Sequence, residues 1–407
     1  MEYSKVGKYY EVFSGYAFKS QDLKETADIP IIKIGNISNG RNVINENMQF
    51  VSKELLGINK KYYVNRGDVL LSLTGSHMNQ PNSVVGRSCR NYSDRLYLLN
   101  QRAGKIVPKN NASLSYIYYV LQTQAMKEMI CCRAYGAANQ VNVSPKSIMS
   151  IKWNFPSSDV QHSIASILST YDTLIENNTK RIRLLEKMAE NLYKEWFVRF
   201  RFPGHENVEM ENGLPKGWKM TNLFDVADVT YGFAFKSNKF CDNAELNPVV
   251  RIRDIQENHT NTYTDEQCED KYLIGKNAIL IGMDGIFHMC LWNGERAYMN
   301  QRVVMLNSKE KGVCNYLLYL AIRPQIKYWE QVISGTTVAH LGDKHLRKVK
   351  VLLPEKAILE KANSIISRAM DEKNILQHQN SFLARQRDLL LPRLMSGKLE
   401  VKEELLE

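Results

Sequence analysis

Residues 157–200 read SSDVQHSIASILSTYDTLIENNTKRIRLLEKMAENLYKEWFVRF, and this stretch predicts one long helix. Alternate steps of four and three residues from Ile164 meet apolar side chains almost throughout, which is the period of a coiled coil. The seam consists of Leu168, Tyr171, Ile175, Ile182, Leu185, Ala189, Leu192 and Trp196, and Asn178 interrupts it. A helix of about 40 residues is ~60 Å long, so a second long element must cover this seam.

A second long helix is predicted from residue 356 to residue 395, where Pro392 and Gly397 end it. Its patchier seam contains Ile358, Ala362, Ile365, Ala369, Leu376, Leu383 and Leu390. We expect the two helices to pack antiparallel, because each follows one copy of a repeated domain.

Polar residues within the two seams bear on how the helices pair. A single buried polar residue such as Asn178 selects register in a coiled coil; the alternative is a helix that bends away and leaves it solvated. Glu372, Gln379 and Gln386 interrupt the second seam. We expect these three to face a partner protein rather than the first helix.

The chain contains an internal repeat. Gly-Tyr-Ala-Phe-Lys-Ser at 15–20 returns as Gly-Phe-Ala-Phe-Lys-Ser at 232–237, and Asn-Gln-Arg at 100–102 returns at 300–302. The same order of predicted elements surrounds both copies: strands at 29–34 and 248–253, strands at 68–75 and 278–285, helices near Tyr116 and Tyr316, and strands ending at Pro156 and Pro354. A domain followed by a long helix therefore occurs twice, with a pseudo-two-fold relation between the halves.

The predicted fold class is α+β, with two repeated α/β domains and two long antiparallel coiled-coil helices. The predicted boundaries are a first domain at 1–156, a central helix at 157–200, a linker at 201–218, a second domain at 219–355, and a C-terminal helix and tail at 356–407. The linker is rich in Gly, Pro and polar residues, so it can carry the chain from one repeat to the next.

The net charge of +11 is concentrated in the first domain, where residues 1–156 carry 20 Lys and Arg against 10 Asp and Glu. Residues 201–355 carry 19 of each sign. A basic domain favours a polyanionic partner such as nucleic acid, although basic domains without such a ligand are common. No apolar run is long enough for a membrane span, and the seven cysteines form no C-x-x-C pair. We therefore expect a cytoplasmic protein with reduced thiols.

Two diverged domains alternating with two long helices, the hexapeptide near the start of each domain, and the helix LIENNTKRIRLLEKMAENLYKEWF together resemble the specificity subunit of type I restriction-modification systems. The resemblance covers essentially the whole chain. It implies that each domain is a target-recognition domain reading one half of a bipartite site in double-stranded DNA. The helical pair would set the spacer and dock two methyltransferase subunits, and through them the restriction and translocase subunits.

The resemblance also implies a chain that is not an enzyme and binds no cofactor or metal. S-adenosylmethionine, ATP and Mg²⁺ would serve the partner subunits. Physical reasoning agrees with two spaced readers, because adjacent major-groove faces on one side of B-DNA lie ~34 Å apart. A helical pair ~60 Å long can hold two domains at that distance.

Polar and basic side chains on loops after strands are the candidate DNA contacts, since Arg, Asn and Gln suit bases while Lys and Ser suit phosphates. In the first domain they are Lys19, Ser20, Thr74, Ser76, His77, Asn79, Gln80, Asn100, Gln101, Arg102, Asn139 and Gln140. In the second they are Lys236, Ser237, Asp284, His288, Asn300, Gln301, Arg302, Thr336, Thr337 and His340. Helix pairing and partner docking are assigned to Leu168, Tyr171, Ile175, Asn178, Ile182, Leu185, Leu192, Trp196, Leu376, Leu383 and Leu390.

An alternative assignment starts from the repeat itself. Residues kept in both copies are structural if readers of two different half-sites diverge, and base contacts then fall in the differing loops 76–82 and 287–292. Because the second domain is net neutral, it needs a local basic face, for which Lys344, Arg347, Lys348 and Lys350 are candidates.

Catalytic signatures are incomplete in this sequence. The glycines at 35–40 resemble a phosphate loop but lack its Lys and Ser/Thr, and the acidic triplet at 269–271 is typical of a solvated loop. His340 and His345 have no further zinc ligands, and residues 153–156 lack the central proline of an adenine-methyltransferase motif. A stand-alone DNA-binding protein, a fused nuclease or methyltransferase with an unrecognised site, and a structural scaffold are the alternative functions.

Overall fold

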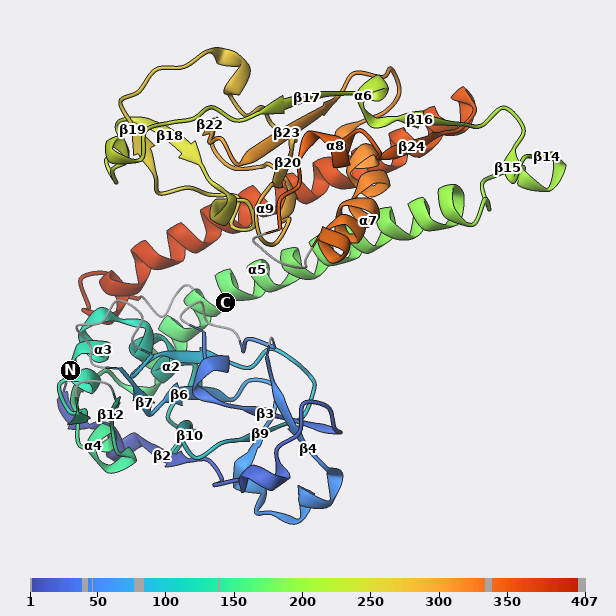
Figure 1. Cartoon of the computed structure of the whole chain (residues 1–407). Helices are drawn as coiled ribbons and strands as arrows, with labels where there is room; N and C mark the ends of the chain where they lie inside the picture. The colour runs from blue at the N-terminus through green and yellow to red at the C-terminus, as the bar shows by residue number, and fades with distance from the viewer. Residues whose placement is uncertain are drawn as a thin grey trace. The chain divides into compact units, whose positions relative to one another are not determined.

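The structure is a computed structural model that describes residues 2–38, 43–45, 47–76, 84–137, 140–333 and 339–401. Figure 1 shows mixed α and β structure together with two very long helices. The chain folds as two compact units: unit 1 comprises residues 1–176 and 381–407, and unit 2 comprises residues 177–380.

Unit 1 is built on an antiparallel sheet with the strand order β2–β10–β6–β8 and a second sheet with the order β4–β3–β9–β5. The first contains β2 (Tyr10–Ser14), β10 (Ala103–Pro108), β6 (Val69–Ser72) and β8 (Ser88–Arg90). The second contains β4 (Gln49–Val51), β3 (Ile29–Ile32), β9 (Tyr97–Leu99) and β5 (Tyr63–Val64), with β3 and β9 parallel. Smaller sheets join β11 (Tyr135–Ala137), β12 (Gln140–Asn142) and β7 (Thr74–Gly75), and β1 (Glu2–Lys5) with β13 (Lys152–Phe155).

The shorter helices of unit 1 are α1 (Val6–Tyr9), α2 (Leu114–Gln122), α3 (Gln124–Cys131) and α4 (Pro145–Met149). Short 3₁₀ helices are η1 (Ser20–Asp22), η2 (Ile34–Asn36), η3 (Lys53–Gly57) and η4 (Lys60–Tyr62). Ser113, Thr123 and Ser144 accept hydrogen bonds from the first turns of α2, α3 and α4, which explains where these helices begin.

Unit 2 repeats this plan with the sheets β17–β23–β20–β21 and β19–β18–β22. Their strands are β17 (Ala227–Tyr231), β23 (Val303–Ser308), β20 (Ile279–Gly282), β21 (Met289–Leu291), β19 (Tyr263–Thr264), β18 (Asn247–Val250) and β22 (Tyr298–Met299), with β18 and β22 parallel. β16 (Lys219–Asn222) pairs with β24 (Lys350–Leu353), and β14 (Met210–Glu211) pairs with β15 (Leu214–Pro215).

The shorter helices of unit 2 are α6 (Leu223–Val226), α7 (Asn315–Ile333) and α8 (Asp343–Leu346). Short 3₁₀ helices are η6 (His205–Asn207), η7 (Ser237–Lys239), η8 (Ile252–Asp254) and η9 (Asp270–Tyr272). Pro324 lies inside α7 at the repeat position where α2 ends and α3 begins in unit 1.

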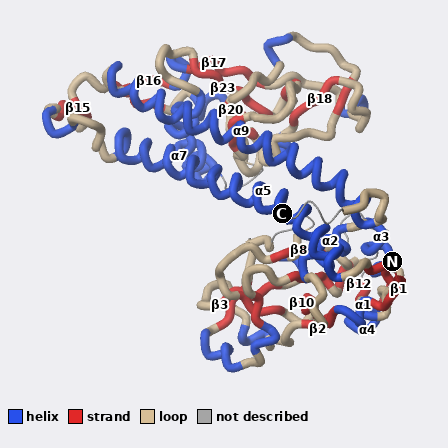
Figure 2. The backbone as a smooth tube through the Cα atoms, turned by 180° about the vertical axis from the view of Figure 1, so that it is seen from behind, coloured by secondary structure: helices blue, strands red, loops and turns tan. Residues whose placement is uncertain are grey.

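The sheets of the two units thus have equivalent strand orders. Figure 2 shows strands and helices mixed in each unit. The predicted α+β class with two repeated domains and two long helices is confirmed. The prediction of a loop at 287–292 is wrong, because residues 289–291 form β21, whose Cys290 pairs with Leu280, while Phe287 and Trp292 are buried.

The strands β6 of unit 1 and β20 of unit 2 are buried on both faces, because their side chains alternate between two cores. In unit 1, Val69 and Leu71 pack with the residues of α2, whereas Leu70 packs with the second sheet. In unit 2, Ile279 and Ile281 pack with α7, whereas Leu280 packs with the second sheet. The continuous apolar runs in the sequence reflect this double covering.

The long helices are α5 (Ser158–Tyr193), which continues as the π-helical turn η5 (Lys194–Val198), and α9 (Lys356–Met395). Each contributes residues to both units. In unit 2, Asn178 contacts Gln379 and Glu186 contacts Lys373, so rising numbers on α5 meet falling numbers on α9 and the segments are antiparallel. Within the described ranges, no helix has the length and apolar character needed to cross a membrane.

We expect Gly232→Ala to destabilise unit 2 by about 1–3 kcal/mol, the usual cost of overpacking. A Cβ at Gly232 would lie 1.9 Å from the carbonyl oxygen of Asn300, and at the matching Gly15 it would lie 2.3 Å from that of Leu99. Urea denaturation measures the effect. Gly275→Ala is the control, because nothing lies within 4 Å of its added Cβ; equal effects of the two variants would contradict the prediction.

Candidate nucleic-acid interface

The two shared motifs of the repeat contact each other in both units. The amide of Tyr16 donates to the carbonyl of Leu99, and the amide of Phe233 donates to that of Met299. Asn100, one residue on, is buried in unit 1. Gly15 and Gly232, which precede these aromatic residues, pack directly against the backbone of the facing strand end. The two repeated motifs therefore have a structural role, because they connect the two sheets of each unit.

The hexapeptides end in exposed residues. Lys19 and Ser20 are exposed where η1 begins, and Lys236 and Ser237 are exposed where η7 begins. The amide of Lys236 donates to Glu266 at 3.1 Å, which fixes the backbone and leaves its ammonium in solvent. These four residues are therefore placed as surface groups.

A junction of three segments recurs in both units and gathers most of the remaining candidates. In unit 1 the amide of Leu73 donates to the carbonyl of Arg102, and the amide of Val143 donates to the carbonyl of Leu73. In unit 2 Met283 stands in place of Leu73, receiving from Leu341 and donating to Arg302. We call these sites the unit 1 edge and the unit 2 edge.

At the unit 1 edge, Gln101, Arg102 and Gln140 are exposed and Ser76 is half-buried. No residue in the described part of unit 1 forms an ion pair with Arg102. Thr74 instead points inward, and its hydroxyl donates to the Asn142 side chain at 2.7 Å. The candidates His77, Asn79, Gln80 and Asn139, and the rest of loop 77–82, lie outside the described residues.

At the unit 2 edge, the Asp284 carboxylate contacts two other candidates, His340 and Arg302. Nδ1 of His340 lies 2.6 Å from Oδ1 of Asp284, and Nε of Arg302 lies 3.3 Å from Oδ2. Gln301 is exposed, and Asn300 and His288 are half-buried. Thr336 and Thr337 lie outside the described residues. Three predicted residues thus meet at one point: His340 and Asp284 share a hydrogen bond, and Arg302 forms an ion pair with the same carboxylate.

The basic residues near α8 lie on the surface of unit 2. Lys344, Arg347, Lys348 and Lys350 are all exposed. Burial and the positive charges of Lys344 and Lys348 lower the pKa of His345. Asp343 partly neutralises Arg347, so Lys344, Lys348 and Lys350 supply most of the open positive charge here, with the Lys350 ammonium held by a hydrogen bond to Asn222.

The helix seams are covered along their length. The buried apolar seam positions are Leu168, Ala189, Ala362, Ala369 and Leu376. The half-buried ones are Tyr171, Ile175, Ile182, Leu185, Leu192, Trp196, Ile358, Ile365, Leu383 and Leu390. In unit 2, Asn178 donates to Gln379 at 3.4 Å, so it pairs across the seam.

The expectation that the polar positions of the second seam face a partner protein is wrong for two of them. Gln379 contacts Asn178, and Glu372 forms an ion pair with Arg181 of α5. Both have polar partners on the first helix, which removes the need for an outside contact. Gln386 is exposed.

Sequence reasoning missed a buried ion pair in unit 1, which we call the Arg387 cluster. The Arg387 guanidinium of α9 bonds the Asp172 carboxylate of α5, and the Tyr119 hydroxyl of α2 donates to Asp172 at 2.6 Å. Both charged side chains are only 7% exposed. Burial opposes the charge on Arg387, but the Asp172 carboxylate prevails and raises the pKa of the guanidinium.

Exposed apolar residues on the long helices were missed as well. Leu184 of α5 is 66% exposed and Phe382 of α9 is also 66% exposed. Counting from Pro156 and Pro354, these two residues occupy the same position in the repeat. Aligning the two predicted helices on Pro156 and Pro354 would have identified Leu184 and Phe382 as a pair. The apolar period of each helix alone does not.

The chain matches one protein family and is similar to individual members of that family. Residues 1–187 and 215–381 match the family described as Type I restriction modification DNA specificity domain. The chain is 26% identical to the type I restriction enzyme MjaIX specificity subunit of Methanocaldococcus jannaschii, covering 75% of this chain and 73% of that protein. It is 28% identical to the EcoBI specificity subunit of Escherichia coli over 49% of this chain and 43% of that protein.

The fold has a solved counterpart. The S subunit of a type I restriction-modification system from M. genitalium superposes with a TM-score of 0.60 and 15% identity, over 97% of this chain and 95% of that one. Duplicated domains, two long helices and a family match to both halves lead to one assignment: the chain belongs to the specificity subunits of type I restriction-modification systems.

Proposed function

We propose that each unit reads one half of a bipartite target in double-stranded DNA. The observation that carries the proposal is the recurrence of one hydrogen-bonded edge in both units, with Arg102 or Arg302 exposed on it and different residues around it. A common scaffold with different polar groups is what two readers of unlike half-sites need.

The chemistry of the edges suits bases and phosphates. Arg102 at the unit 1 edge has the bidentate geometry that guanine accepts, and Gln101 and Gln140 suit adenine. At the unit 2 edge, Asp284 either accepts from a cytosine amino group or orients Arg302 toward a base. Lys19 and Lys236 suit the DNA backbone, which fixes register without reading sequence.

We propose that the helical pair sets the spacer between the half-sites and docks two methyltransferase subunits, which in turn carry the restriction and translocase subunits. The 36 residues of α5 and 40 residues of α9 correspond to lengths of about 54 and 60 Å. Leu184 and Phe382 are exposed at one repeat position, which suits two copies of one partner.

In this proposal the chain performs no chemistry. S-adenosylmethionine, ATP and Mg²⁺ act in the partner subunits, which methylate adenine and cleave DNA. Incubating the purified chain alone with DNA, Mg²⁺ and S-adenosylmethionine separates this from a fused enzyme. Any methylation or cleavage by the chain itself would refute it.

Arg102→Ala is expected to weaken DNA binding by about 1–3 kcal/mol, because one exposed guanidinium is lost. Binding to cognate DNA is measured against salt concentration with the chain and its methyltransferase subunit. If Arg102 contacts a phosphate, the salt slope falls by about one and all sequences lose affinity equally; if it reads a base, the loss is confined to one position.

Arg201→Ala, which removes the same charge in the linker, is the control for that experiment. Mapping methylated adenines completes the test, since Asp284→Ala should change only the half-site that Arg102→Ala leaves intact. Unchanged affinity and unchanged methylation in both edge variants would contradict the assignment of the edges as readers.

A further inference from the structure

The Arg387 cluster of unit 1 has a counterpart in unit 2 that lacks the ion pair. Tyr319 occupies the repeat position of the cluster's tyrosine, counted from the shared Asn-Gln-Arg motif. Counted from Pro156 and Pro354, Met370 occupies the position of the aspartate and Ala189 that of the arginine. Two charged side chains are thus replaced by a thioether and a methyl group.

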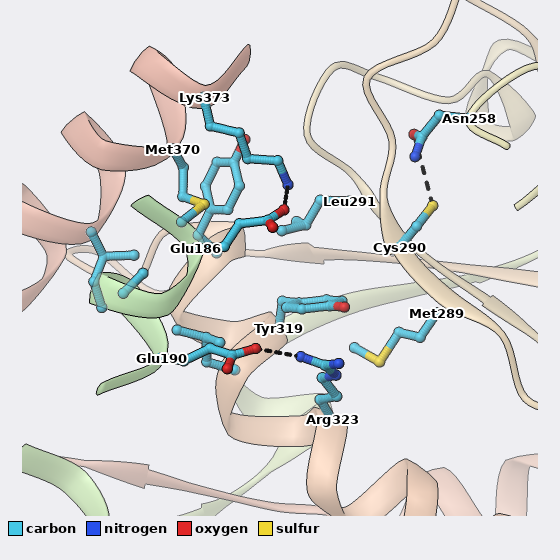
Figure 3. A pocket seen from close by; sticks show the side chains of 14 residues that line it. Glu186, Glu190, Asn258, Met289, Cys290, Leu291, Tyr319, Arg323, Met370 and Lys373 are labelled. Carbon is cyan, nitrogen blue, oxygen red and sulfur yellow. Dashed lines mark hydrogen bonds and ion pairs between the residues drawn. The ribbon is translucent and has the colours of Figure 1, made fainter. Parts of the chain in front are cut away.

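A cavity of about 240 Å³ lies where these replacements meet. Ala189, Tyr319 and Met370 all line it, and β21 adds Met289 and Cys290 (Figure 3). All of its lining residues belong to unit 2. The space that the arginine side chain fills in unit 1 is therefore left open here by the sequence.

Two ion pairs border the cavity and balance its charge. Glu186 lies 2.7 Å from Lys373, and Glu190 lies 2.8 Å from Arg323, as Figure 3 shows. Both carboxylates already have cationic partners. A cation entering the cavity would meet a methionine where unit 1 has its aspartate, and it would compete with Lys373 and Arg323 for the two carboxylates.

We propose that this cavity binds a neutral, ring-sized molecule with one hydrogen-bonding group. Tyr319, Met289 and Met370 offer the aromatic and thioether contacts that such rings prefer. An apolar cavity of about 150 Å³ already holds benzene, so the volume is sufficient. Within the described part of unit 2 the Tyr319 hydroxyl has no hydrogen-bond partner, and it supplies the polar contact.

Indole is the probe, and Cys290 is the reporter. Full-length protein is alkylated with N-ethylmaleimide, and modification of each cysteine is followed by mass spectrometry. Burial raises the pKa of the Cys290 thiol to about 12, so the reaction is run at pH 9 to reach a measurable rate. Indole at ten times its dissociation constant should slow Cys290 modification about elevenfold, while the exposed Cys132 is unaffected.

Variants and charged probes decide the interpretation. Ala189→Leu and, independently, Met370→Phe fill the cavity, and either should abolish protection by indole. Benzamidinium and benzoate, of similar size but charged, should protect less than indole. Absence of protection in the wild-type chain, or stronger protection by benzamidinium, would overturn the proposal. None of these readouts depends on DNA binding or on partner subunits.

Discussion

Arg387→Ala is expected to destabilise unit 1 by about 3–5 kcal/mol, because it removes one partner of a buried ion pair and takes the guanidinium away from the Asp172 carboxylate. The Tyr119 hydroxyl still donates one hydrogen bond, but a neutral donor does not replace a guanidinium. Urea denaturation measures the loss. Hydrogen exchange in peptides from α2 and the first part of α5 should locate it in unit 1.

A combined replacement is the control for this prediction. Asp172→Leu, Arg387→Met and Tyr119→Phe made together remove both charges and the hydroxyl that donates to Asp172, and such apolar exchanges are often neutral or stabilising. The free energy of unfolding of this triple variant should therefore lie within about 1 kcal/mol of the wild-type value, or above it. If Arg387→Ala costs as little as the triple variant, the ion pair is not what holds these helices together.

If the helical pair docks two methyltransferase subunits as proposed, Leu184→Glu and Phe382→Glu are each expected to remove one of them, and the double variant should remove both. A carboxylate buried against an apolar partner surface lacks a counter-charge and costs several kcal/mol, enough to lower affinity more than a hundredfold. Native mass spectrometry of the reconstituted complex measures the stoichiometry.

Leu174→Glu is the matched control for docking. Leu174 is also exposed on α5, at 45%, but its repeat position on α9 is Glu372, which pairs with Arg181. Its substitution should leave two partner subunits bound. Retention of two subunits by the Leu184 and Phe382 double variant would show that partners dock elsewhere.

Much of the fold followed from local patterns in the sequence. Local sequence patterns predicted the long helix from Leu168 to Trp196 and the buried strands at Val69–Ser72 and Ile279–Gly282. The internal repeat predicted the order of these elements. The strand β21 was missed because three residues carry too little periodicity.

The candidate site was predicted less completely, because contacts between distant residues leave no local signal. Asp172 and Arg387 are 215 residues apart, and the sequence around each residue does not predict a contact with the other. Asp284 and His340 were both proposed, but their hydrogen bond depends on how the backbones of two segments pair. Thr74 was proposed for its loop, whereas the structure turns its hydroxyl inward to Asn142.

The interleaving of the two long helices through both units has a consequence for biosynthesis. Unit 1 is completed by residues 381–401, which leave the ribosome only after the whole of unit 2, residues 177–380, has been made. Until these residues emerge, the Arg387 guanidinium cannot reach Asp172, and Leu391, Leu394 and Met395 are missing from the core of the first unit. Nascent or truncated chains therefore expose an unfinished first domain, which makes them targets for proteases and chaperones.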